Sequence, residues 1–164
     1  MVYVGSWDPD NKLYAFNAGT GAPLPGWPLT ITFPNFVGRE VITTNPVVAN
    51  GVVYVGTVNG HVYAFNATTG ALLPGWPVGY PQGPAQSVYS DPAVANGVAY
   101  VGANDHKFYA FNATTGALLW SASTGGAITS SPAVAAGTVY VGSGDGKLYA
   151  YTILGLSGAG PLNR

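Results

Sequence analysis

The chain repeats one short sequence, and this repetition limits the folds open to it. The eleven residues YAFNATTGALL occur at 63–73 and again at 109–119, and a close copy, YAFNAGTGAPL, occurs at 14–24. The leading tyrosines of these copies and of a weaker fourth copy, spaced 49, 46 and 40 residues apart, are Tyr14, Tyr63, Tyr109 and Tyr149. The tyrosines of the VYVG or AYVG segments follow nearly the same period, at Tyr3, Tyr54, Tyr100 and Tyr140. Four copies of one unit predict a repeat architecture.

Each unit is predicted to be an antiparallel sheet of four short strands. The clearest unit, between Asp91 and Trp120, reads DPAVA, GVAYVG, KFYAFN and ALLW, and turn pairs such as Asn-Gly and Thr-Gly separate strands of this kind. In GVVYVG, at 51–56, both faces of the strand are apolar. A sheet with one wet face would alternate apolar and polar residues, so these sheets need cover on both sides. Because no segment reads as a helix, only other sheets can provide that cover.

The predicted fold class is therefore all-β: a β-propeller of four-stranded antiparallel blades, with about four blades in this chain. The 164 residues suffice for one domain with a real core, so we expect a single unit over 1–164. Its approximate repeats are 1–44, 45–90, 91–130 and 131–164.

The repeated segment also resembles a known family. The stretch from Ala110 to Trp120 is similar to the tryptophan-docking motif of pyrroloquinoline-quinone (PQQ) type propeller repeats, Ala-x-Asp-x-x-x-Gly-x-x-x-Trp. Asn112 replaces the acid and can still accept a hydrogen bond from the turn. The first two copies carry a Pro-Gly insertion before the tryptophan, and the fourth lacks both the Thr-Gly turn and the tryptophan. The resemblance implies structural docking between blades for the tryptophans and turn glycines of the motif, which are Trp27, Trp76, Trp120, Gly21, Gly70 and Gly116.

The strand inventory leaves the closure of a ring open. The sequence contains three PAVA-type strands, four YVG strands, four YAF strands and three tryptophan strands, so the two end repeats are each incomplete. Three arrangements fit: a compact four-bladed ring, half of a larger ring completed by a second chain, or a piece of a longer propeller. The family's usual ring has about seven or eight blades, within the range of known propellers. We therefore expect self-association or further blades, because bare blade faces would leave a large apolar patch in water.

Composition excludes several classes of partner. Five basic residues are scattered along a chain of net charge −1, which offers no patch able to neutralise several phosphates, so no nucleic-acid partner is expected. No apolar run approaches the 18 residues of a membrane helix, so no membrane span is expected. The chain has no cysteine, and Met1 leads into VYVG without a signal sequence. Low charge and abundant Thr, Asn, Gly and Tyr favour a secreted, periplasmic or cell-surface protein, whose signal would lie outside this sequence.

Charged residues concentrate in one repeated turn. Each copy places a cation two residues before the YAF-type tyrosine and an acid or amide two residues before that cation; the cations are Lys12, His61, Lys107 and Lys147, and their partners are Asp10, Asn59, Asp105 and Asp145. Ordinary turn chemistry with solvated charges explains this pattern, and a ring of like sites for a repetitive ligand is the alternative. Asp8, Asp10 and Asn11 are weak candidates for Ca²⁺, because they lack the spacing and the final bidentate acid of a calcium loop.

A possible binding surface lies in the irregular segments. Its members are Trp7, Arg39, Glu40, Tyr80 and Tyr89. Trp7 either anchors its loop to the core or stacks on a sugar or a partner. The NAT sequences at Asn66 and Asn112 fit the N-glycosylation pattern, although the docking turn explains both without a glycan.

The sequence predicts a non-catalytic module with no cofactor. Neither histidine has a neighbour that would mark it as a general base, and no serine or acid completes a catalytic group. The leading interpretation is a propeller for protein binding or structural assembly. The alternatives are a fragment of a PQQ- and calcium-dependent quinoprotein dehydrogenase, and a glycan-binding or self-assembling surface protein.

Overall fold

A computed structural model describes residues 1–7, 9–32, 40–79 and 87–153, and within these ranges it contains fourteen strands and no helix. The first sheet contains β1 (Val2–Gly5), β2 (Lys12–Phe16) and β3 (Leu29–Thr30), and the second contains β4 (Val47–Ala49), β5 (Val52–Gly56), β6 (His61–Asn66) and β7 (Val78–Gly79). The third sheet contains β8 (Ala93–Ala95), β9 (Val98–Gly102), β10 (Lys107–Asn112) and β11 (Leu118–Ser123), and the fourth contains β12 (Ala133–Ala135), β13 (Thr138–Gly142) and β14 (Leu148–Thr152). No helical span capable of crossing a membrane occurs in the described part of the chain.

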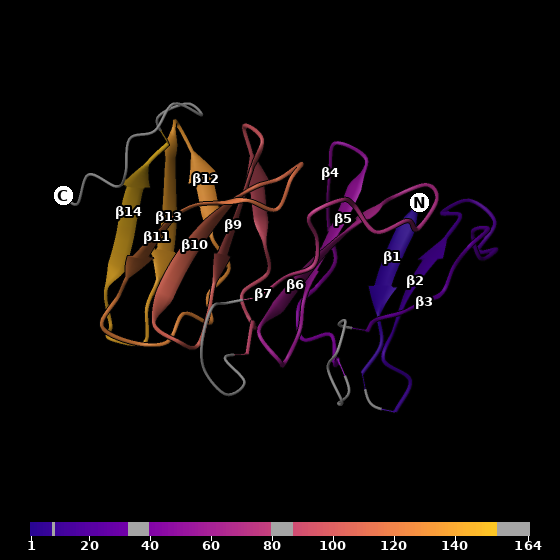
Figure 1. Cartoon of the computed structure of the whole chain (residues 1–164), viewed down its shortest axis with the longest axis horizontal. Helices are drawn as coiled ribbons and strands as arrows, with labels where there is room; N and C mark the ends of the chain where they lie inside the picture. The colour runs from indigo at the N-terminus through magenta and orange to yellow at the C-terminus, as the bar shows by residue number, and fades with distance from the viewer. Residues whose placement is uncertain (8, 33–39, 80–86, 154–164) are drawn as a thin grey trace.

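The predicted all-β architecture of about four blades is confirmed. All strand pairs are antiparallel, and within each sheet the strands follow one another in chain order. Figure 1 shows the four sheets side by side in sequence order, with the first and fourth sheets at opposite ends of the row. The described residues thus form an open stack, and the compact four-bladed ring considered from the sequence is wrong for this structure. The reason is that the apolar clusters join only sheets that are neighbours in sequence.

Two-residue hairpins set the register of β4, β8 and β12, the first strands of the second, third and fourth sheets, which we call the inner strands. Asn50 and Gly51 have positive φ angles of 50° and 75°, and Asn96 and Gly97 have 51° and 75°. Two consecutive positive φ angles are typical of the type I′ turn, whose twist matches that of an antiparallel hairpin. The pairing of Ala49 with Val52 follows directly from this turn. Inner strands therefore join their sheets in one fixed register.

Equivalent side chains fill the three spaces between sheets. Between the first two sheets, Leu13, Ala15 and Trp27 of one sheet meet Val53, Val55, Tyr63 and Phe65 of the next. The same repeat positions form the cluster between the second and third sheets and the cluster between the third and fourth. Each sheet thus presents one set of side chains to the sheet before it and another set to the sheet after it. This arrangement explains why both faces of the YVG and YAF strands are apolar.

The tryptophans lie between sheets. Trp27 and Trp76 are 7% and 5% exposed, and the ring of Trp76 lies 6.3 Å from that of Phe111 in the next sheet. Trp120 is partly buried, and its ring centroid is 5.5 Å from that of Tyr151. The turn before Trp76 also touches the docking turn of the next sheet: a Cβ on Gly116, whose φ is +70°, would lie 2.4 Å from the carbonyl oxygen of Gly75. Glycine is therefore required where the two turns meet.

Candidate functional site

The repeated turn between the YVG and YAF strands holds a carboxylate bonded to a tyrosine. Asp10 accepts hydrogen bonds from Tyr14 Oη at 2.5 Å and from Ser6 Oγ at 3.0 Å. Asp145 accepts a hydrogen bond from Tyr149 Oη at 2.7 Å, and Asp105 accepts one from Tyr109 Oη. The tyrosine hydroxyl is the main cause of the lowered pKa of Asp10, and it holds the pKa of Asp145 at about 2.

Two lysines of these turns are ion-paired at the surface. Lys12 Nζ lies 3.2 Å from Asp10 Oδ1, and Lys147 Nζ lies 3.7 Å from Asp145 Oδ2. Exposed pairs of this kind contribute little to stability. The predicted turn chemistry therefore describes these charges. The Asp-to-Tyr spacing of four residues occurs in three copies, so the sequence carries a repeated signal for this hydrogen bond.

The second sheet departs from this pattern. Asn59 stands in the place of the aspartate, and Glu40 comes in from the preceding connection, with Oε1 2.6 Å from Nδ1 of His61. Glu40 is 2% exposed, so its expected place on an exposed binding surface is wrong: this carboxylate is buried beside His61. Glu40 Oε2 and Tyr63 Oη are both buried without a hydrogen-bond partner among the described residues. Burial, reinforced by the Glu40 carboxylate, raises the pKa of Tyr63.

The described acidic groups do not fit a calcium–quinone centre. Asp10, Asp105 and Asp145 lie on three different sheets, and each is bonded within its own turn. Asp91 accepts hydrogen bonds from the backbone N–H and the side-chain amide of Asn45. Within the ranges that the structure describes, no three His, Cys, Asp or Glu side chains come together as a metal site would require.

The weak calcium candidates are divided. Asp8 lies outside the described residues, and the carboxylate of Asp10 is already bonded to Tyr14, Ser6 and Lys12. Asn11 is 6% exposed and has a φ of 50°, as a tight turn requires.

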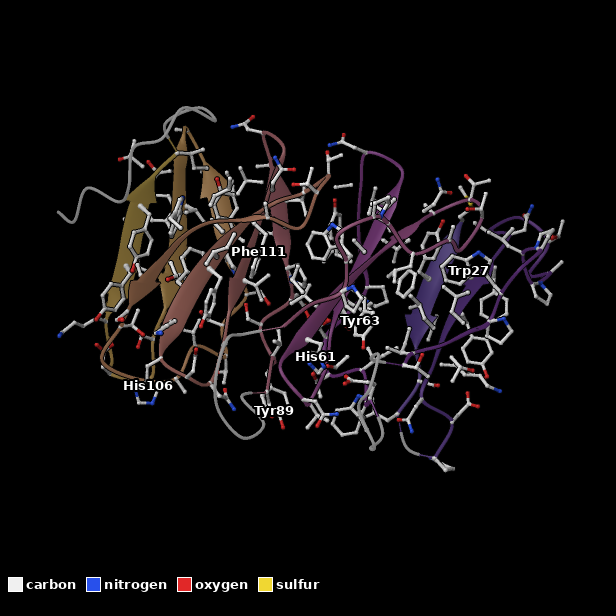
Figure 2. The ribbon with its side chains drawn as sticks, in the orientation of Figure 1. Trp27, His61, Tyr63, Tyr89, His106 and Phe111 are labelled. Atoms are coloured by element: carbon white, nitrogen blue, oxygen red, sulfur yellow. The ribbon has the colours of Figure 1, made fainter. Side chains whose placement is uncertain are left out.

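Of the predicted contact residues that the structure describes, Trp7 and Tyr89 are exposed and Glu40 is buried. Trp7 is 64% exposed, so the interpretation that it anchors a loop to the core is wrong, and its indole is available to a partner. Tyr89 is 41% exposed, while Arg39 and Tyr80 lie outside the described residues. Figure 2 shows Tyr89 and His106 along the same edge of the stack, where His61 also lies further inward.

The asparagines of the NAT sequences act within the docking turn. Asn66 Oδ1 accepts hydrogen bonds from the backbone N–H groups of Thr68 and Thr69, both at 2.9 Å. Asn112 Oδ1 accepts them from Thr114 and Thr115, both at 3.0 Å. The expectation that asparagine replaces the family's acid as a turn acceptor is confirmed.

The first sheet leaves one apolar face uncovered. We call this the N-terminal end face; it consists of Val2, Val4, Tyr14 and Phe16, which share one side of the β1–β2 pair. Val2 is 48% exposed and Val4 45% exposed. Val53 and Val55, the equivalent residues of the second sheet, are fully buried. The difference arises because the second sheet has a sheet before it in the stack.

On the fourth sheet, the opposite kind of face has no other described sheet packed against it. This C-terminal end face consists of Tyr140, Leu148 and Ala150, which share one side of the β13–β14 pair. Leu148 is 73% exposed, whereas Phe108 at the same place in the third sheet is fully buried. Tyr140 is 36% exposed, against 1% for Tyr100. No residue-level pattern marked these faces, but the incomplete end repeats indicated that such faces exist.

Comparison with known proteins places the chain among propellers. The family model described as "Outer membrane protein assembly factor BamB" matches residues 1–73. The crystal structure of BamB from Moraxella catarrhalis matches 99% of this chain and 44% of its own, with a TM-score of 0.73 and 22% identity. The computationally designed Ika4 protein matches 93% of this chain and 86% of its own, with a TM-score of 0.69 and 18% identity. These two structures share the fold of this chain.

An enzyme of the same architecture matches a shorter part. The quinohemoprotein alcohol dehydrogenase ADHIIG from Pseudomonas putida HK5 matches 71% of this chain and 19% of its own, with a TM-score of 0.59 and 28% identity. The chain thus spans less than half of the BamB structure and about a fifth of the dehydrogenase. No curated protein matches the sequence.

Proposed function

We propose that this chain belongs to the PQQ-type repeat propellers and is a non-catalytic module for protein binding and structural assembly. The observation that carries the proposal is the pair of uncovered end faces. Val2 and Val4 of the first sheet are nearly half exposed, whereas the equivalent valines of the second sheet are fully buried. Leu148 of the fourth sheet is 73% exposed. Exposed apolar surface of this kind marks an interaction site.

The two end faces complement each other. The residues of the N-terminal end face are at the repeat positions that, in every later sheet, pack against the sheet before it. The residues of the C-terminal end face are at the repeat positions that, in every earlier sheet, pack against the sheet after it. The three inter-sheet clusters show that these two sets pack well together within the chain. We infer that the C-terminal end face of one copy packs against the N-terminal end face of a second copy, which is a head-to-tail contact between different surfaces.

The proposed location is outside the cytoplasm, in the periplasm, at the cell surface or in the medium. The family model that matches residues 1–73 is described as an outer membrane protein assembly factor, and this description supports the proposal. The low fraction of charged residues in the chain, 7%, agrees with this location.

Light scattering over a concentration series tests the assembly. The 16.7 kDa chain should form species of twice that mass or more as its concentration rises. Leu148→Asp should abolish this growth, because it places a charge in the proposed contact. Leu118→Asp is a matched control, since Leu118 is 49% exposed on β11 and lies outside both end faces. A wild-type chain that stays monomeric throughout, or equal effects of the two substitutions, would contradict the proposal.

A second candidate is part of a quinoprotein dehydrogenase, and the likeness to ADHIIG at 28% identity favours it. Added PQQ and calcium should then raise the melting temperature, because a ligand of the folded state stabilises it by mass action. Our proposal predicts no shift. A shift that saturates with PQQ would favour the dehydrogenase.

A further inference from the structure

The first sheet ends in an open edge at β1. In the other three sheets the corresponding strand pairs with an inner strand, β4, β8 or β12. In the first sheet the order is β1-β2-β3, and within the described ranges no residue pairs along the other edge of β1. An unpaired edge exposes backbone donors and acceptors to which a further strand can be added.

The backbone groups on this edge can be identified from the second sheet. Gly56 donates its N–H to Thr44 Oγ1 at 2.8 Å, and its carbonyl accepts a hydrogen bond from the N–H of Thr43 at 3.0 Å. Both groups of Gly56 therefore point toward the inner-strand side. Backbone groups alternate in direction along a strand, so those of Tyr54 point the same way. Tyr3 and Gly5 hold these two places in β1, and their N–H and C=O groups line its open edge.

The three inner strands show which sequence fits such an edge. Their segments share the pattern Ser/Thr-x-Pro-Ala/Val-Val-Ala and occupy 44–49, 90–95 and 130–135. In each segment the first hydroxyl accepts a hydrogen bond from the glycine N–H that ends the neighbouring strand, at 2.8, 3.2 and 2.9 Å. Gly5 is the corresponding glycine of β1. One sequence pattern is thus matched to one edge in all three complete cases.

The second residue of each segment links neighbouring sheets. The N–H of Asn45 donates to Asp91 Oδ1 at 2.7 Å, and the N–H of Asp91 donates to Ser131 Oγ at 3.1 Å. The acceptor in each case is the side chain of the same position in the next sheet. For a segment on the first sheet, that acceptor is the exposed side chain of Asn45.

A groove of about 420 Å³ lies at this place. Its walls are Tyr3, Val4, Gly5 and Trp7 on one side and the segment 42–46 on the other. The 42–46 segment includes Asn45, and Trp7 is 64% exposed. The open edge, the acceptor and an exposed aromatic side chain therefore face one hollow.

We propose that the open edge of β1 binds an extended segment of a partner protein with the sequence Ser/Thr-x-Pro-Ala/Val-Val-Ala, which completes the first sheet as its fourth strand. Each of the chain's own three segments of this sequence is already paired within its own sheet. This site is the edge of the sheet and not its face. The proposal therefore stands independently of the head-to-tail assembly.

The test uses the heptapeptide TNPVVAN, the sequence of residues 44–50, and two of its N-methylated forms. In β4, Val47 pairs with Tyr54 and faces β5 with its N–H, whereas the N–H of Val48 points away. N-methylation at the position of Val47 should weaken binding about tenfold or more, and N-methylation at the position of Val48 should change it less than about threefold.

Titration into the ¹⁵N-labelled chain supplies the readout. Bound peptide should shift the amide signals of Tyr3 and Gly5 first, together with the indole N–H of Trp7. Absence of saturable binding up to about 1 mM would overturn the proposal. Equal affinities of the two methylated peptides, or shifts confined to other sheets, would overturn it as well.

Discussion

Replacing valine with threonine at one repeat position measures how far each sheet is covered. Val4, Val55, Val101 and Val141 are equivalent residues of the four sheets, and they are 45%, 0%, 0% and 1% exposed. Threonine has nearly the shape and β-propensity of valine, so the substitution changes mainly the polarity of one branch. Differences among the four variants therefore report burial rather than strand formation.

The expected magnitudes follow from that burial. A hydroxyl buried without a partner costs about 1–3 kcal/mol in protein mutational data. The variants at the three buried positions, 55, 101 and 141, should therefore lose roughly this much stability. Val4→Thr should lie within about 0.5 kcal/mol of the wild type. For a chain of this size, each kcal/mol corresponds to about 2–4 °C in melting temperature. The variants at the three buried positions should therefore melt about 2–12 °C lower than the wild type.

Thermal and urea unfolding at low protein concentration provide the assay, because dilution dissociates weak assemblies. Raising the concentration should then add a penalty at position 4 alone, since assembly covers Val4. If Val4→Thr lost as much stability in the dilute monomer as the variants at the buried positions, the N-terminal end face would not be open. If no variant lost stability, the inter-sheet packing described above would be wrong.

Further predictions concern packing, pH and an unpaired hydroxyl. Gly102→Ala should destabilise by about 1–3 kcal/mol, because its Cβ would lie 2.1 Å from the isoleucine side chain packed over it, whereas Gly142→Ala, with its nearest contact at 3.3 Å, should be mild in the same urea titration. The pKa of Asp145 is lowered to about 2 by the tyrosine hydroxyl, so its stabilising effect should be present above pH about 4 and lost as the pH falls toward 2; Asp145→Asn should remove this part of the pH dependence of the melting temperature. Tyr54→Phe should cost about 1 kcal/mol, because it removes the hydrogen bond to a backbone carbonyl in the next sheet, whereas Tyr63→Phe, which removes a buried hydroxyl that has no partner in the described structure, should be neutral or stabilising by calorimetry.

The fold could be predicted because its determinants are local and repeated. The Asn-Gly pairs fix the hairpins, and apolar residues on both faces of segments such as 51–56 require sheets on both sides. The predicted inventory of three, four, four and three strands of each kind matches the fourteen strands observed. The incomplete end repeats also indicated an open arrangement, but the number of blades in a completed ring could not be predicted, because it depends on small rotations between sheets that no residue type specifies.

The candidate site was less predictable for a similar reason. The burial of Glu40 depends on its contact with His61, 21 residues further along the chain, and no local pattern encodes that contact. Trp7 lies outside the repeat pattern, so its exposure beside the groove at β1 likewise had no repeated counterpart from which it could be predicted. By contrast, the role of Asn112 as a turn acceptor could be predicted, because its partners lie two and three residues away.

The native mass of a mixture of two variants tests head-to-tail assembly most directly. Val4→Asp disables the N-terminal end face, and Leu148→Asp disables the C-terminal end face, so each variant alone should remain a monomer of 16.7 kDa. Mixed in equal amounts, they retain one intact contact and should form a one-to-one dimer that does not grow further. A mixture that stays monomeric while the wild type assembles, or a single variant that assembles as the wild type does, would contradict the account.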